Sequence, residues 1–159
     1  MKKIQDVSRS VEIDASPDLC YRVICDIENY PSWFRHVREL SIRKTGEDGR
    51  ALSVLYTFDL LIKKGIRIVL NYRYDDNARI LHFQSAGGDV SRALGTYEFR
   101  ELPGDRTLLV FSARVDFGML MPQTITEFLS GRVLEDFVQM VREECEKRKG
   151  FFQGRWRRK

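Results

Sequence analysis

The chain has two histidines, His36 and His82, the residue type whose ordinary pKa best suits proton transfer near neutral pH. His36 follows Trp33-Phe34-Arg35 at the start of a predicted strand. His82 stands between Leu81 and Phe83, so in a strand it faces the side opposite to both. We interpret each histidine as a surface or structural residue and not as a catalytic one.

Asp26 and Glu28 come nearest to a catalytic carboxylate pair, but they stand two residues apart at a predicted helix end and face different directions. The sequence has no HxH or HExxH spacing and no carboxylate cluster typical of a metal site. It also has no GxSxG nucleophile motif. We therefore predict no metal and no cofactor, and the sequence identifies no catalytic residue.

Aromatic side chains offer a different chemistry, the recognition of an apolar small molecule. The chain has ten phenylalanines and six tyrosines, and many of them alternate along predicted strands so that they share one sheet face. Such rings most often fill a core, but buried tyrosine hydroxyls need partners and favour a partly wet interior. Burial of roughly 300 Å² of ligand would contribute about 7 kcal/mol before association costs. Specific binding would then need a polar anchor, for which the candidates are Tyr56, Tyr72, Tyr97 and His82.

The first predicted elements are a strand and two short helices. Apolar and polar residues alternate from 7 to 13, the period of a strand. Ser16, Pro17 and Asp18 suit the N-cap and the first turn of a helix. Asn29-Tyr30-Pro31 is expected to stop that helix, and Ser32-Trp33-Phe34 to begin a second short helix or turn.

The rest of the chain predicts a meander of strands and one long helix. Between residues 37 and 117, six short alternating runs are separated by turns at the spacing of antiparallel hairpins. Pro122 opens a helix that we expect to run to about Arg148, with Gly150 ending it. One apolar face of that helix would cover the aromatic face of the sheet, which makes the fold class α+β.

This arrangement resembles the START-like, helix-grip superfamily, and more narrowly its polyketide cyclase/dehydrase branch, which includes coenzyme Q-binding proteins and ribosome-association toxins. One stretch that carries the resemblance is Tyr21 to Pro31, with its Asp-x-x-x-Tyr-Pro ending after Ala15-Ser16-Pro17. Another is Trp33-Phe34-Arg35-His36-Val37, an aromatic pair before the second strand. The third is the long helix that follows the last strand after a short connection containing Gly118 and Pro122. The resemblance covers about residues 7–148.

The resemblance implies a curved seven-stranded antiparallel sheet wrapped around the long C-terminal helix, with two short helices after the first strand and a cavity between sheet and helix. It implies apolar ligands but no single activity. The aromatic and helix-face residues that we expect to bind the ligand are Trp33, Phe34, Tyr56, Phe58, Tyr72, Tyr74, Phe83, Tyr97, Phe99, Phe111, Phe128, Leu129 and Val133.

Charge is concentrated at the C-terminus. Residues 147–159 carry +7 with no acid, so the remaining residues sum to −3 out of a net charge of +4. We divide the chain into a domain at 1–149 and a basic, aromatic tail at 150–159, expected to be flexible. The segment 147–159 is a candidate for contact with a membrane surface or with RNA and the ribosome, or it is only a solubilising terminus.

Composition limits the class of protein further. The chain has 159 residues, no long apolar run and no secretory leader pattern, which favours one cytoplasmic domain, a monomer or a homodimer. Its three cysteines form no CxxC and are expected to be reduced thiols. The favoured function is binding or transport of a lipid, quinone or polyketide-like molecule. The alternatives are an aromatase/cyclase-like enzyme that uses the same pocket and an interaction module that uses the tail.

Overall fold

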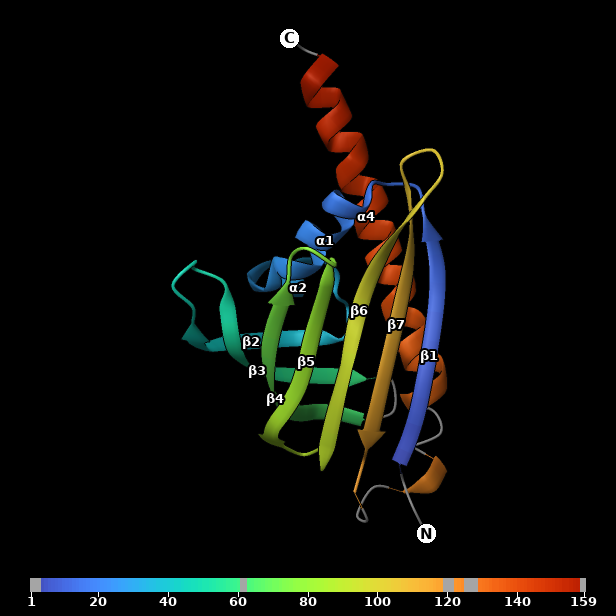
Figure 1. The fold of residues 1–159 in the computed structure, drawn as a ribbon. Helices are drawn as coiled ribbons and strands as arrows, with labels where there is room; N and C mark the ends of the chain where they lie inside the picture. Colours follow the sequence, from blue (N-terminus) through green and yellow to red (C-terminus); the bar gives the residue numbers. More distant parts are fainter. Residues whose placement is uncertain (1–3, 61–62, 119–121, 125–128, 158–159) are drawn as a thin grey trace.

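The computed structural model describes residues 4–60, 63–118, 122–124 and 129–157, with the backbone alone at 129, 130 and 151–157. One seven-stranded antiparallel sheet in the order β1-β7-β6-β5-β4-β3-β2 forms the main layer (Figure 1). Its strands are β1 Ile4–Ile13, β2 Val37–Thr45, β3 Ala51–Leu60, β4 Lys63–Asp75, β5 Ile80–Gly88, β6 Arg92–Leu102 and β7 Arg106–Asp116.

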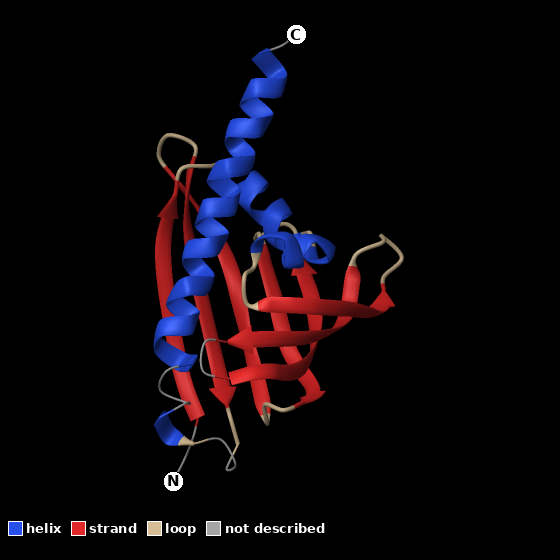
Figure 2. Cartoon of the chain, turned by 180° about the vertical axis from the view of Figure 1, so that it is seen from behind, coloured by secondary structure: helices blue, strands red, loops and turns tan. Residues whose placement is uncertain are grey.

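The helices lie together on one face of this sheet (Figure 2). Between the first two strands come α1 (Pro17–Cys25), the 3₁₀ turn η1 (Ile27–Asn29) and α2 (Tyr30–Trp33). After the last strand, the π-helical turn η2 (Leu129–Val133) leads into α4 (Leu134–Arg157). The α+β class, the seven strands and the long C-terminal helix that sequence patterning predicts are confirmed.

Local chemistry explains where α1 begins. The Ser16 hydroxyl accepts a hydrogen bond from the Leu19 backbone N–H at 3.3 Å, and Pro17 occupies the first helical turn, as expected. The predicted stop at Asn29-Tyr30-Pro31 is wrong in detail, because α1 ends at Cys25 and Pro31 lies in the first turn of α2. Proline lacks only an N–H that a first turn leaves unpaired anyway, so it opens this helix.

The end of α4 also differs from the expectation. The helix does not stop at Gly150 but continues to Arg157, and its last turns extend past the edge of the sheet (Figure 1). A glycine in a helix costs about 1 kcal/mol relative to alanine and does not by itself end the helix. Within the described residues, no helix is both long and apolar enough to cross a bilayer.

The sheet bends strongly, so that β2, β3 and the first part of β4 run across the direction of β1, β6 and β7, while the second part of β4 runs beside β5 (Figure 1). A register shift between Ile68 and Leu70 marks the bend where β4 pairs with β5. There Gly88 has a φ of +116°, and a Cβ on it would lie 2.3 Å from the Arg67 carbonyl oxygen. The bend turns the concave face of the sheet toward α4 and creates the space described below.

Candidate ligand-binding cavity

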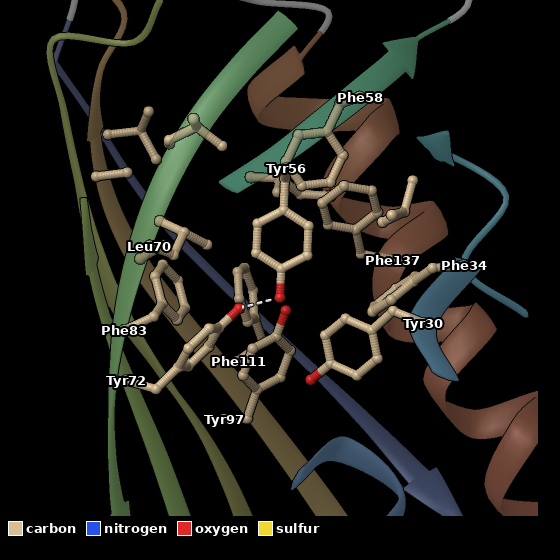
Figure 3. Close-up of a pocket in the computed structure, with 16 residues that line it drawn as sticks. Tyr30, Phe34, Tyr56, Phe58, Leu70, Tyr72, Phe83, Tyr97, Phe111 and Phe137 are labelled. Atoms are coloured by element: carbon tan, nitrogen blue, oxygen red, sulfur yellow. Dashed lines mark hydrogen bonds between the residues drawn. The ribbon is translucent and has the colours of Figure 1, made fainter. Parts of the chain in front are cut away.

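A cavity of about 140 Å³ lies between the concave face of the sheet and the beginning of α4. Figure 3 shows rings from β3, β4, β5, β6 and β7 directed into it, with α2 and α4 supplying further side chains. The lining residues are Tyr30, Phe34, Val37, Tyr56, Phe58, Ile68, Leu70, Tyr72, Phe83, Ala93, Tyr97, Phe111, Ala113, Val115, Leu134 and Phe137.

Small residues on β6 and β7 leave the cavity open. Ala93 on β6 and Ala113 on β7 face inward, on the same side of the sheet as Tyr97 and Phe111 of these two strands. Their side chains are much smaller than those two rings. Gly95 pairs with Ala113, and a Cβ on Gly95 would lie 2.7 Å from the Phe83 ring and 2.2 Å from the Ser112 carbonyl oxygen. Without a side chain at Gly95, the Phe83 ring can lie over β6 and form one wall.

A stack of rings closes the side of the cavity next to the helices. Phe137 of α4 lies 5.4 Å from the Phe34 ring and 6.2 Å from the Phe58 ring, centroid to centroid. Behind them, Trp33 stacks on Phe34 at 4.2 Å. Aromatic contacts of this kind contribute about 0.5–1.5 kcal/mol each beyond area burial. They hold the start of α4 against the end of α2 and the sheet.

Tyrosine hydroxyls supply the polar groups of the cavity. The Tyr56 and Tyr72 hydroxyl oxygens lie 2.5 Å apart, within hydrogen-bond distance, and the Tyr97 hydroxyl points toward this pair from β6 (Figure 3). The Tyr30 hydroxyl instead donates to the Ile24 backbone carbonyl. Burial raises the pKa of Tyr56, Tyr72 and Tyr97 above its ordinary value. Charge repulsion from neighbouring tyrosines raises it further for Tyr56 and Tyr72, although the hydrogen bond with Tyr72 opposes the rise for Tyr56. These hydroxyls therefore stay protonated and act as hydrogen-bond donors.

Neither histidine lines the cavity. His36 is buried, and its Nε2 lies 3.5 Å from an Asp136 carboxylate oxygen on α4. His82 is half-buried in β5 between Leu81 and the cavity residue Phe83, and its pKa is lowered by burial and by Arg73 on the neighbouring strand. His82 is therefore not an anchor for a ligand in this cavity.

The structure brings part of the predicted ligand-binding set together. The members that line the cavity are Phe34, Tyr56, Phe58, Tyr72, Phe83, Tyr97 and Phe111. That any of them binds a ligand stays a prediction. Phe128 lies outside the described residues, as does the side chain of Leu129.

Four predicted residues lie elsewhere. Trp33 is behind Phe34, and Phe99 is 1% exposed in the core, where its ring meets Tyr21 edge to face at 6.4 Å. Tyr74 faces Arg50, whose guanidinium lies 4.1 Å from the ring centroid, and its hydroxyl donates to a backbone carbonyl. Val133 is buried just before α4. Tyr74 and Phe99 alternate along their strands as the cavity residues do, and Val133 shares the predicted apolar face of the long helix, but these side chains and Trp33 fill the core or a rim.

Several lining residues were not predicted as site residues. Phe137 could have been found from its place on the apolar face of the helix, and Leu134 is its neighbour on the first turn. Ala93 and Ala113 had a weaker signal, because small side chains at inward positions of aromatic strands leave room. Tyr30 has no such signal in the sequence, because its place before Pro31 predicts a helix stop.

No group of three or more His, Cys, Asp or Glu side chains in the described parts of the chain is arranged to hold a metal ion. The lining described above likewise has no side chain that is charged near neutral pH. These features define an α+β protein in which a curved antiparallel sheet and a C-terminal helix enclose an apolar cavity with a few phenolic hydroxyls.

Comparison with known proteins places this class more narrowly. Residues 13–142 match the family model described as polyketide cyclase / dehydrase and lipid transport, so the chain belongs to that family. No curated protein matches it in sequence.

Solved structures show the same fold. A START superfamily protein from Mycobacterium smegmatis has a TM-score of 0.79 at 21% identity, covering 89% of this chain and 97% of that one. The ZhuI aromatase/cyclase from Streptomyces sp. R1128 has a TM-score of 0.77 at 21% identity, covering 91% and 95%. Norcoclaurine synthase from Thalictrum flavum has a TM-score of 0.71 at 14% identity, covering 94% and 98%. The chain therefore has the START-like helix-grip fold.

Proposed function

We propose that the protein binds or carries an apolar small molecule of the lipid, quinone or polyketide-like kind in the cavity between the sheet and α4. The observation that carries the proposal is the cavity lining, which combines aromatic and aliphatic walls with a few phenolic hydroxyls. Mostly apolar walls with a small number of placed polar groups are typical of small-molecule sites. Membership of a family that includes lipid transport agrees with this function.

An aromatase/cyclase-like reaction in the same cavity is the alternative. Acid–base catalysis works best with a group whose pKa lies near the working pH. Among the described lining residues only tyrosines titrate, and burial raises the pKa of Tyr97, Tyr72 and Tyr56 further from neutrality. The lining thus favours binding over proton transfer.

Native mass spectrometry of the purified protein, followed by solvent extraction, tests the proposal. We expect a mass above that of the bare chain and a released apolar compound. Much less of the compound should be released from the Ala113→Leu variant, whose larger side chain occupies part of the cavity. A bare mass, with no thermal shift from lipids, quinones or polyketide-like compounds, would contradict the carrier function.

A second role concerns the C-terminal segment, because α4 stays helical to Arg157 beyond the sheet while residues 147–159 carry +7 (Figure 1). We infer that this extension contacts an anionic surface, for which each basic residue near a membrane contributes about 1 kcal/mol. Co-sedimentation with phosphatidylserine vesicles should be lost when residues 150–159 are deleted. Retention of RNA in place of vesicles would instead favour the ribosome-associated alternative.

A further inference from the structure

The cavity contains hydroxyl hydrogens that have no acceptor. Each phenol has one O–H hydrogen, and the Tyr56–Tyr72 bond uses only one of the two. The Tyr97 hydroxyl makes no hydrogen bond with any described residue, although its side chain is more than nine-tenths buried. Two donors thus remain unpaired where the three hydroxyls face one another (Figure 3). Tyr97 lines the cavity and its hydroxyl oxygen is not among the fully enclosed atoms, so the donors in this cluster are available to a guest that accepts hydrogen bonds.

The charge of the surroundings decides which acceptor suits these donors. No Lys, Arg or His side chain lines the cavity in the described parts of the chain. Arg50, which lies over the ring of Tyr74 outside the lining, is paired with Asp48 and Asp76 at 2.7 and 2.8 Å. An isolated carboxylate loses its hydration on burial and would find no counter-charge here. A neutral oxygen with two lone pairs, such as a carbonyl, can accept both hydrogens without that penalty.

The shape of the cavity limits the group that carries this oxygen. Its volume of about 140 Å³ is close to the roughly 150 Å³ of an apolar cavity that holds one benzene ring. The rings of Phe83 and Phe111 are nearly parallel, with an interplanar angle of 14° and centroids 6.1 Å apart. They form flat walls beside the tyrosine cluster. A flat six-membered ring fits such walls better than a branched or globular group.

We propose that the cavity recognises a neutral ring compound through its carbonyl oxygen, which accepts hydrogen bonds from Tyr97 and from the Tyr56–Tyr72 pair. This inference rests on the proposed ligand-binding function and narrows it to a ligand class. It also selects against ligands whose carboxylate would have to enter the tyrosine cluster.

Three probes of similar size test the proposal with the full chain: acetophenone, α-methylstyrene and benzoate. The second replaces the carbonyl oxygen with a methylene group of similar shape, and the third replaces the ketone with an anion. Dissociation constants can be measured by NMR titration. We expect acetophenone to bind about tenfold more tightly than α-methylstyrene, the effect of one to two neutral hydrogen bonds, and benzoate to bind more weakly than either.

The matched variants are Tyr97→Phe and Tyr30→Phe. Both keep a ring in the cavity wall, but only Tyr97 has an unpaired hydroxyl, since the Tyr30 hydroxyl is bonded to Ile24. Tyr97→Phe should reduce the preference for acetophenone to about threefold or less, whereas Tyr30→Phe should preserve it. Because Tyr97→Phe breaks no bond, its melting temperature should match or exceed that of the wild type. Tyr72→Phe provides a second test at the same cluster.

The outcomes distinguish a failure of carbonyl recognition from a failure of the proposed ligand-binding function. Equal binding of acetophenone and α-methylstyrene, or a preference that survives Tyr97→Phe and Tyr72→Phe, would overturn carbonyl recognition while the apolar-binding function stands. Tighter binding of benzoate would also overturn it. Failure of all three probes, together with a ligand-free native mass, would instead contradict the proposed function itself.

Discussion

Individual side chains decide whether the concave face of this sheet is filled or hollow. Ala93 and Ala113 leave room where longer side chains would extend into the cavity, and Gly95 admits the Phe83 ring. The cavity therefore depends on small residues as much as on the aromatic ones that line it. Changing the size of one such residue should alter ligand binding without disturbing the fold.

Ala113→Leu tests this dependence. The added carbons would enter a cavity of about 140 Å³, so we expect them to be buried without serious overlap, at about 0.8 kcal/mol of stabilisation per methylene. Ligand binding should fall at least tenfold while the melting temperature stays equal or rises. Ala86→Leu, on an exposed part of β5, is the matched control. Unchanged ligand binding in Ala113→Leu would show that the ligand binds elsewhere.

The reactivity of Cys25 provides a pH-dependent test at the same scale. Burial raises the pKa of this thiol to about 12, despite opposing effects from Tyr21 and Arg50. At pH 8 its thiolate fraction would be roughly 10⁻⁴, against about a quarter for a thiol with a pKa of 8.5. Alkylation of Cys25 by iodoacetamide, followed by peptide mass spectrometry, should be far slower in native than in denatured protein. It should rise about tenfold per pH unit between pH 8 and 10. Rapid native labelling at pH 8 would contradict the burial argument.

At the level of elements, contacts between α2, β3 and α4 enclose the cavity, and the bend between β4 and β5 gives the sheet its curvature. Phe34, Phe58 and Phe137 come from three elements that are distant in sequence. The bend depends on a glycine at the end of β5, because the neighbouring strand passes too close for any side chain. Because of this close approach, the cost of steric overlap at this glycine can be measured separately from the cost of its positive φ.

Gly88→Ala and Gly87→Ala form a matched pair. Both glycines have a positive φ, +116° and +135°, so alanine is strained at either position. Only at Gly88 would the new Cβ also meet backbone atoms, at 2.3 Å from the Arg67 oxygen and 2.7 Å from the Ile68 Cα. In urea denaturation, Gly88→Ala should therefore lower the free energy of unfolding by about 1–3 kcal/mol more than Gly87→Ala does. Equal losses would mean that the bend tolerates a side chain.

At the level of the whole molecule, the two proposed functions lie at opposite ends of α4. Leu134 and Phe137, on its first turns, line the cavity, while the basic residues 147–157 continue the same helix past the sheet (Figure 1). The cavity and the extension share no described side chain. Binding of a small molecule and contact with an anionic surface should therefore be separable.

Deletion of residues 150–159 tests this separation. The deleted segment carries four basic residues and no acid, so the shortened chain would have a net charge of zero in place of +4. We expect its melting temperature and its dissociation constant for acetophenone to stay within error of the full chain. Binding to phosphatidylserine vesicles should fall at least tenfold at low salt. Loss of ligand binding on deletion would show that the two ends of α4 are coupled.

The sequence by itself determined the order and type of the elements. Period-two alternation predicted the strands, steps of three and four predicted the long helix, and Ser16 with Pro17 located the start of α1. The shared aromatic face and the helix that covers it also followed, because hydrophobic faces must be buried against one another. These features depend on neighbours along the chain, which a sequence displays directly.

Only the tertiary structure decided which inward residues line a cavity. Tyr97 and Phe99 follow the same alternation on β6. Yet the Tyr97 hydroxyl faces the cavity, whereas the Phe99 ring is 1% exposed in the core. The difference arises from what lies opposite each ring after the sheet has bent and α4 has packed. A cavity is the volume that side chains from distant elements leave unfilled, and no local pattern along the chain records that volume.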